Sequence, residues 1–336
     1  MKRWALTVFT TVGLSTEAAT ATVENLAFAE ARGVKTHGFM RLPIYVDRIL
    51  GGGISAHATL EISIDKGGLV ILDGGDGIGA ASGFGASKIA IDRARTYGIG
   101  CAIVRNANHF GAAAFYSSLM ADAGMFGIAV CNTDKAMAPP FGGTRVLGTN
   151  PLAIALPVPA AERPQLDMAT SEVSLGKVLV AAQEHKDIPL GWAVDEHGRP
   201  TSSASAALAG ALLPSGGPKG FGLAFMIDAL VALSGATTSP QVGAMYGDRS
   251  TPQKLGLAFI AIDGALGVSA DEYARVIRSL VDDVHGGGPG ASGAPSLAPG
   301  EPELARLREF SGDLEVSDEL LEDLTRIAGL TGVVLL

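Results

Sequence analysis

The chain has 336 residues, of which 47% are hydrophobic and 18% are charged, a composition typical of a globular protein with a large buried core. Its 34 acidic residues outnumber its 25 basic ones, which gives a formal net charge of −9 at pH 7. This balance argues against nucleic acid or an anionic membrane as a partner, because both need a basic surface. The most apolar helical segment, 221–236, is too short to span a membrane and contains Asp228.

The N-terminal part is predicted to form two helices that flank a short connecting segment. Ser15 is a good N-cap for the first helix, and Gly33 can end it. The second helix follows Pro43 and stops at the glycine triplet 51–53. Residues 2–9 imitate a secretory signal, but cleavage after the later alanine-rich stretch would cut into the first helix. The two cysteines lie in apolar runs, which fits free thiols in a reducing compartment, so we expect a cytoplasmic protein.

Residues 68–131 alternate between short apolar runs and helical patterns. Three strands and two helices are expected here, at 69–72, 101–104 and 126–131 for the strands and at 86–97 and 112–123 for the helices. Strands separated by helices are typical of α/β proteins with a parallel sheet, which is the sheet that this pattern by itself predicts.

The second half continues with mixed elements. Strands are expected at 152–156 and 257–262, and helices at 173–184, 221–233 and 270–284. A polar loop is expected at 192–205. The glycine-rich segment 286–300 predicts a further loop. Two short helices close the chain, the second opened by Ser317.

The segment 36–45, THGFMRLPIY, carries a histidine and an arginine four residues apart. If the segment is helical, positions i and i+4 share a face, so His37 and Arg41 can contact the same small anion. Histidine exchanges a proton near neutral pH, and a guanidinium binds a carboxylate through two hydrogen bonds. The pair therefore predicts a site for a small oxo- or hydroxy-acid, although a solvated helix surface would show the same pattern.

Three further candidates lie beside strand or helix ends. His109, in the loop 106–111 between a strand and a helix, is a second candidate acid or base, and a hydrogen-bonded surface histidine is the alternative. Lys219 lies in a glycine-rich turn before a helix, where it would contact either a phosphate or only solvent. Asp167 is predicted to open a helix, where it would bind a ribose or simply cap that helix.

Several common motifs are absent or incomplete. Residues 75–80 fit the form G-x-G-x-x-A, but the following helix is predicted to begin only near Ala86, and the next strand ends at Arg105 where an NAD site needs an acid. An ordinary glycine loop is the better interpretation. The six histidines make no H-x-x-x-H or Cys/His cluster, so no metal site is predicted. The G-x-S-x-G motif of hydrolases is also missing.

An ordered series of short motifs gives the chain a family resemblance. The series is THG at 36–38 with Arg41, Pro43 and Tyr45, NHFG at 108–111, LGTNP at 147–151, DMATS at 167–171, GWAVD at 191–195, GGPKG at 216–220 and PGE at 299–301. It resembles the malate/L-lactate dehydrogenase family, which is unrelated to the Rossmann-type lactate dehydrogenases and includes ureidoglycolate, sulfolactate and Δ1-piperideine-2-carboxylate enzymes. Two departures are Thr36 in place of the usual serine and Pro218 in place of a frequent aromatic residue.

The resemblance runs nearly end to end and implies a fold and an assembly. The fold would be a non-Rossmann α/β fold with a mixed, largely antiparallel sheet, instead of the parallel sheet, and the protein would be a homodimer. Residues 1–55 with 266–336 would form a helical dimerisation and substrate region, 56–125 an α/β segment, and 126–265 the NAD(P)-binding region.

The resemblance also implies hydride transfer between NAD or NADP and C2 of a small 2-hydroxy or 2-oxo acid. His37 would donate or accept the proton with support from Thr36, although His109 has this role in some members, and Arg41 and Thr149 would bind the substrate. The implied cofactor contacts are His109, Phe110, Gly111, Ala112, Ala113, Thr133, Asp167, Met168, Ala169, Lys219, Gly300, Glu301 and Pro302.

Two other functions stay open. A cyclic imine carboxylate, such as Δ1-piperideine-2-carboxylate or Δ1-pyrroline-2-carboxylate, needs the same cation and the same hydride, which would make the protein an imine reductase. The departures at Thr36 and Pro218 would also fit a homologue that binds the cofactor without turnover. NAD and NADP are not distinguished, because no basic residue is tied to a ribose 2′-phosphate pocket.

Overall fold

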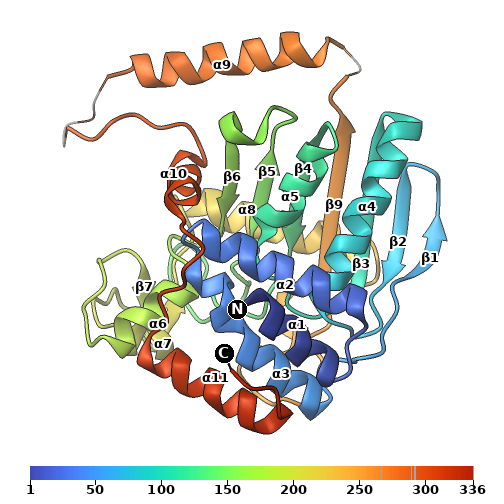
Figure 1. The fold of residues 1–336 in the computed structure, drawn as a ribbon. Helices are drawn as coiled ribbons and strands as arrows, with labels where there is room; N and C mark the ends of the chain where they lie inside the picture. Colours follow the sequence, from blue (N-terminus) through green and yellow to red (C-terminus); the bar gives the residue numbers. More distant parts are fainter. Residues whose placement is uncertain (266, 289, 291–292, 336) are drawn as a thin grey trace.

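The computed structural model describes residues 1–265, 267–288, 290 and 293–335. Within them, a sheet of seven strands runs in the order β1-β2-β3-β9-β4-β5-β6 (Figure 1). The strands are β1 Glu61–Asp65, β2 Leu69–Asp73, β3 Ile99–Ala107, β4 Met125–Cys131, β5 Leu152–Ala155, β6 Gln165–Met168 and β9 Leu255–Asp263.

Strand pairing in this sheet is mixed. β2 and β3 are parallel, and the other neighbouring strands pair antiparallel. The largely antiparallel sheet that the family resemblance implies is therefore confirmed, and the parallel sheet that the alternating pattern predicts is wrong. The reason is that β9, from late in the chain, lies between β3 and β4 and pairs antiparallel with both.

Helices cover both faces of the sheet (Figure 1). Helices α4 (Gly79–Tyr97) and α5 (Ala113–Asp122) pack on one face, where the buried side chains include Leu72 and Phe259. Helix α8 (Pro218–Ala232) packs on the other face, against side chains such as Ile71 and Ile103. Since alternate residues of a strand point to opposite faces, neighbours such as Ile71 and Leu72 belong to different cores.

A second layer of helices joins the two ends of the chain. It contains α1 Lys2–Thr11, α2 Thr16–Ala31, α3 Leu42–Gly51 and α11 Asp318–Thr331. The residues that imitate a secretory signal form α1, whose Trp4 and Phe9 are buried. The Trp4 indole donates to the Val333 carbonyl at 3.1 Å, so the chain ends lie side by side (Figure 1). The N-cap prediction for Ser15 is confirmed, because its hydroxyl accepts from the Ala18 amide.

The start of α4 differs from the prediction. The helix begins at Gly79, not near Ala86. A Cβ at Gly79 would lie 1.9 Å from the Asn108 carbonyl oxygen, so only glycine allows the helix to begin against this loop. The small residues of its first turns look irregular in the sequence, but they are buried under the N-terminal layer and against the sheet.

The remaining elements form smaller units. A small core unites α6 Leu175–Gln183, β7 Ala193–Val194, α7 Ala204–Ala209 and β8 Ala211–Leu212, so the predicted polar loop 192–205 contains part of a small folded unit. The short 3-10 turns η3 Ala160–Glu162 and η4 Ser239–Gln241 lie in connections, and α10 Glu301–Glu309 precedes α11. Helix α9 Ala270–Gly286 lies at one edge of the molecule (Figure 1) and contacts it through Arg278, which pairs with Glu162 at 3.4 Å, and His285, which lies 2.9 Å from Glu301. Residues 289, 291 and 292 of the predicted glycine-rich loop lie outside the described residues.

Candidate active site

The segment 36–45 folds as two 3-10 turns and the start of a helix, not as one α-helix. The turns are η1 Lys35–His37 and η2 Phe39–Arg41, and α3 follows directly. Gly38 between them is extended, and a Cβ there would lie 2.0 Å from the Glu30 carboxylate. The segment connects two helices, as predicted, but the helical i and i+4 arrangement considered for His37 and Arg41 does not form. Even so, Arg41 folds back on the first turn, because its Nε donates to the Thr36 carbonyl at 2.6 Å.

The two predicted acid/base histidines lie together. The rings of His37 and His109 stack with their centroids 5.7 Å apart. Nδ1 of His109 lies 2.7 Å from the Tyr45 hydroxyl and accepts a hydrogen bond from the Gly111 amide at 3.3 Å. Because a main-chain amide can only donate, Nδ1 is an acceptor and the neutral ring carries its proton on Nε2.

Burial and a cation determine the protonation of this cluster. Burial, followed by the charge of Arg41, lowers the pKa of His37 and of His109 well below the ordinary value. Both imidazoles are therefore neutral at pH 7. Burial raises the pKa of Tyr45, so its hydroxyl keeps its proton and can donate to His109. Arg41 is only 8% exposed, and burial lowers its pKa, an effect that the nearby Asp134 carboxylate opposes without reversing it.

Thr36 supports His37 through its side chain. The threonine hydroxyl lies 3.2 Å from Nδ1 of His37. Its extra methyl group packs against α6, where a Cβ at Gly176 would lie 2.9 Å from Thr36 Cγ2. A glycine on α6 thus makes room for the methyl group, and the threonine keeps the hydroxyl that a serine would offer.

Hydrogen bonds join three loops around Thr149. The Thr149 amide donates to the Thr133 hydroxyl at 2.9 Å, and the two hydroxyls lie 3.5 Å apart. The Thr149 carbonyl accepts from the Thr170 amide, and the Thr170 carbonyl accepts from the Ser215 amide in the turn before α8. Lys219 lies exposed in the first turn of that helix.

The other predicted cofactor residues gather near the start of α5. Asp167 and Met168 belong to β6, so the prediction that this segment opens a helix is wrong. The Asp167 carboxylate instead accepts from the Ala114 amide at 3.2 Å and caps α5, which begins where the loop 109–113 ends. The turn at Gly300 lies against the same strand, because the Gln165 amide donates to the Pro299 carbonyl at 2.8 Å.

Comparison with known proteins identifies the family. A family model described as malate/L-lactate dehydrogenase matches residues 1–325. The chain belongs to the malate/L-lactate dehydrogenase family. L-sulfolactate dehydrogenase from Methanocaldococcus jannaschii is 35% identical over 335 residues, which cover 99% of this chain and 96% of the relative. Malate dehydrogenase from Pyrococcus horikoshii is 37% identical over 290 residues, which cover 82% and 78% of the two chains.

Solved structures of the malate/L-lactate dehydrogenase family have the same fold. The sulfolactate dehydrogenase from M. jannaschii matches with a TM-score of 0.91 over 99% of this chain and 96% of that chain. A Δ1-piperideine-2-carboxylate reductase from Pseudomonas syringae pv. tomato matches with a TM-score of 0.85 at 28% identity, over 98% and 97% of the two chains. The chain is thus an NAD(P)-dependent oxidoreductase of the 2-hydroxy acid dehydrogenase type.

One residue at the site belongs to none of the family motifs. The Tyr246 hydroxyl accepts a hydrogen bond from Nη1 of Arg41, although the two residues are 205 positions apart in the chain. Sulfur of the neighbouring Met245 lies 3.8 Å from the same nitrogen. No motif or spacing in the sequence marks Tyr246, because only the packing of its loop brings it to Arg41.

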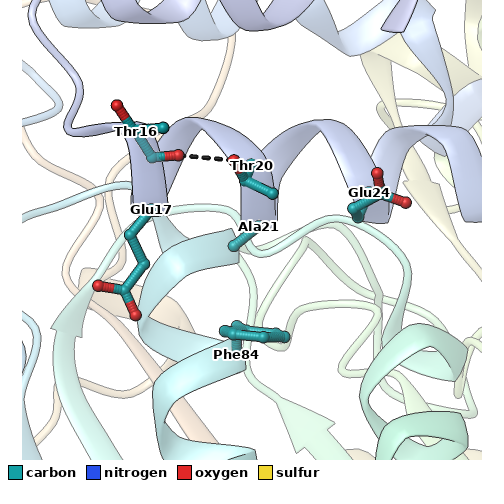
Figure 2. A pocket seen from close by; sticks show the side chains of 6 residues that line it. All are labelled: Thr16, Glu17, Thr20, Ala21, Glu24 and Phe84. Atoms are coloured by element: carbon teal, nitrogen blue, oxygen red, sulfur yellow. Dashed lines mark hydrogen bonds between the residues drawn. The ribbon is translucent and has the colours of Figure 1, made fainter.

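A separate surface cavity of about 440 Å³ contains none of these residues. It lies between α2 and α4, with Ala21 and Phe84 at its base and the carboxylates of Glu17 and Glu24 at its edge (Figure 2). Thr16 and Thr20 complete its lining. The two carboxylates make it unfavourable for an anionic substrate or a pyrophosphate.

Among the described residues, no helix combines the length and the hydropathy that a membrane-spanning segment needs. The same residues contain no group of three or more His, Cys, Asp or Glu side chains that could hold a metal ion.

Proposed function

We propose that the enzyme transfers a hydride between NAD or NADP and C2 of a small 2-hydroxy or 2-oxo acid of the malate or lactate type. The observation that supports this most directly is the buried Arg41 guanidinium beside the two neutral, stacked imidazoles of His37 and His109. A carboxylate and an adjacent carbonyl or hydroxyl need this combination of a fixed cation and a proton carrier.

Arg41 binds and orients the substrate carboxylate in this proposal. Its Nε donates to the Thr36 carbonyl. The fork formed by the two terminal guanidinium nitrogens therefore has a fixed direction before the substrate arrives. A carboxylate that displaces water from a buried guanidinium forms charge-assisted hydrogen bonds, which are shorter and stronger than neutral ones. Thr149 would contact the substrate from the neighbouring loop, through a hydroxyl close to that of Thr133.

His109 is the proposed principal acid and base, with His37 and its partner Thr36 beside it. The Tyr45 hydroxyl and the Gly111 amide fix the Nδ1 side of the His109 ring, which leaves Nε2 for the substrate oxygen. In the reductive direction the Nε2 proton of His109 moves to the oxygen at C2, while the Tyr45 hydroxyl gives its proton to Nδ1, so the imidazole stays neutral. In the oxidative direction both protons move back. A bound nicotinamide supplies or accepts the hydride.

The residues around α8 and α5 are chemically suited to a dinucleotide. Gly216 and Gly217 both have positive φ values, +57° and +62°, and form a tight turn before α8, where a phosphate would meet the Lys219 cation at the helix N-terminus. Asp167 offers a carboxylate for ribose hydroxyls near the loop 109–113. Thr133, Met168, Ala169 and the turn 300–302 complete the proposed contact set.

We further propose a cytoplasmic homodimer with the three regions defined above, of which 1–55 and 266–336 provide the dimer contacts. Of the residues of α9, only Ala274 is buried, and Val276 and Leu280 are 60% and 58% exposed. On the α8 face of the sheet, Ile99 and Ile262 are also exposed. Apolar surfaces of this kind on a folded chain favour burial against a second copy.

Reduction of a cyclic imine carboxylate is the second candidate. It is supported by the likeness to the P. syringae reductase and by the fact that an imine carbon beside a carboxylate would use the same Arg41 cation. A homologue that binds the cofactor without turnover would need a damaged acid/base cluster, whereas Thr36 keeps its hydroxyl next to His37.

A substrate panel tests the proposal. Oxidation of NADH and of NADPH is followed by absorbance with pyruvate, oxaloacetate, sulfopyruvate and Δ1-piperideine-2-carboxylate. We expect turnover of a 2-oxo acid and a loss of kcat/KM of about 100-fold in Arg41→Ala, with only partial recovery in Arg41→Lys because the fork is lost.

Activity on the imine alone would favour the second candidate. Cofactor binding without turnover of any compound would favour the non-catalytic homologue, and near-normal kinetics of Arg41→Ala would refute the role of Arg41.

A further inference from the structure

We propose that Tyr246 is a second ligand of the substrate carboxylate and that Arg48, a buried arginine on α3, positions it. The proposal rests on the proposed role of Arg41 in carboxylate binding. Tyr246 belongs to the segment 243–253 between η4 and β9, which we call the Tyr246 loop. Three sets of contacts hold this loop over Arg41.

The first set is made by Arg48. This residue is fully buried and lies about two helical turns after Arg41. Its guanidinium donates to main-chain carbonyls of the Tyr246 loop, namely those of Ala244 at 3.4 Å, Met245 at 3.3 Å, Asp248 at 3.1 Å and Thr251 at 2.6 Å. A buried cation is costly to desolvate, and here its two terminal nitrogens fix the path of one loop, whereas its Nε has no hydrogen-bond partner among the described residues. Arg48 thus holds the backbone on both sides of Tyr246.

The second set involves the glycine triplet at the end of α3. The Gly53 amide donates to the Arg249 carbonyl at 2.9 Å. A Cβ at Gly53 would lie 2.4 Å from that oxygen, and a Cβ at Gly51 would lie 2.8 Å from Arg249 Cβ. The glycines therefore allow the Tyr246 loop to lie directly on the helix end, which explains a feature that the sequence presents only as a helix stop.

The third set joins the loop to the acid/base cluster. The Gln253 side chain accepts from the His109 amide at 3.0 Å, and the Gln253 amide donates to the Asn108 side chain at 3.1 Å. The Tyr246 loop is thus bonded to α3 along its middle and to the His109 loop at its end. It spans the two parts of the site that must act on one substrate.

The hydrogen bonds at Arg41 leave a donor on Tyr246. Nε of Arg41 is bonded to the Thr36 carbonyl, and Nη1 donates to the Tyr246 hydroxyl. Because this hydroxyl accepts from the cation, its own proton is free for another acceptor. The tyrosine is 51% exposed, and its ring centroid lies 5.5 Å from the guanidinium carbon, so the hydroxyl lies where an anion would approach Arg41. A carboxylate there receives hydrogen bonds from both residues.

Removal of one hydroxyl tests the proposal. In Tyr246→Phe we expect the KM of the best 2-oxo acid of the panel to rise about 10-fold or more, because a hydrogen bond to a charged group is lost. We expect kcat to change by less than about 2-fold and the affinity for NADH to stay the same. Calorimetric titration with oxalate, an unreactive carboxylate, should show a similar loss of affinity. The control is Tyr97→Phe, which removes an exposed hydroxyl at the far end of α4 and should change none of these values.

The positioning role of Arg48 needs a double-mutant cycle. Arg48→Met should raise KM in the wild-type background and have little further effect in the Tyr246→Phe background, because both changes act on one interaction. Equal effects in the two backgrounds would refute this role. A normal or lowered KM in Tyr246→Phe would overturn the proposal, since the tyrosine would then only fill space at the site without binding the carboxylate. If Arg41→Ala is also normal, the proposed function falls with it; if Arg41→Ala is impaired, only the Tyr246 proposal falls.

Discussion

His109 shows how single contacts decide the chemistry at the residue scale. Its sequence position beside a helix start indicates a ligand-binding loop, but not which ring nitrogen is free. The donor from Gly111 and the hydroxyl of Tyr45 occupy Nδ1. Among the described residues, the one hydrogen-bond partner of the His37 ring is the Thr36 hydroxyl. The better-fixed ring is expected to carry the larger share of the proton transfer.

We therefore expect His109→Gln to lower kcat by about 100-fold or more and His37→Gln to lower it less, since positioned acid/base catalysis contributes about 10² to 10⁴. The measurement is steady-state kinetics in both reaction directions on the best substrate pair. Tyr45→Phe should lie between the wild type and His109→Gln, because it keeps the imidazole but releases one of its bonds. A larger loss in His37→Gln would reverse the assignment.

The same histidines predict how stability depends on pH. Their folded-state pKa values are lowered, so the unfolded chain binds more protons once the pH falls below the ordinary histidine value of about 6.5. Their contribution to the free energy of unfolding is full above that pH and is lost as the pH falls from there towards the folded-state pKa. Urea unfolding at pH 7, 6 and 5 should show this decline. His109→Gln should make it shallower, and an unchanged slope would contradict the assignment.

At the scale of elements, α4 carries the clearest consequence of a close contact. Gly79 begins this helix against the carbonyls of Asn108 and His109, and a Cβ there would lie 1.9 Å and 2.6 Å from the two oxygens. The helix start and the loop that carries His109 therefore cannot move independently.

Gly79→Ala should lower the free energy of unfolding by about 2 kcal/mol or more and reduce kcat, because overpacked backbone must shift. Gly222→Ala is the matched control. It lies within α8, where an added Cβ would have no described atom within 4 Å, so alanine should leave stability the same or slightly raise it. Chemical denaturation with parallel activity assays would check both variants. Equal free energies of unfolding for the two variants would show that the Asn108 loop can move away from the added methyl group without loss of stability.

Elements also show where sequence patterns fail. The 3.6-residue period locates α5, α6, α9 and α11 close to their observed bounds, because the spacing of apolar residues along a helix is a local feature of the sequence. Asp167 is different: its neighbours suggest a helix start, whereas it lies in β6 and caps α5. A capping residue on a separate strand leaves no spacing signal in the sequence.

At the scale of the whole molecule, the exposed face of α9 leads to a prediction about assembly. Val276 and Leu280 are mostly exposed in the single chain, so a charge placed there should weaken contact with a second copy without disturbing the fold.

Leu280→Glu should shift the protein from dimer to monomer in sedimentation or light scattering and leave its circular dichroism unchanged. Ser279→Glu adds the same charge on a neighbouring, polar position of α9 and should stay dimeric. Wild-type protein that is monomeric at micromolar concentration would contradict the proposed homodimer.

The sequence by itself determined the family and most of the helical segments, and it marked His37, Arg41 and His109 as candidate site residues, because motifs and periodic patterns are properties of nearby residues. Only the tertiary structure decided that β9 lies between β3 and β4, that two 3-10 turns carry the His37 segment, and that Tyr246 reaches Arg41. These features depend on contacts between distant segments, whose geometry follows from the packing of the whole chain and not from local spacing.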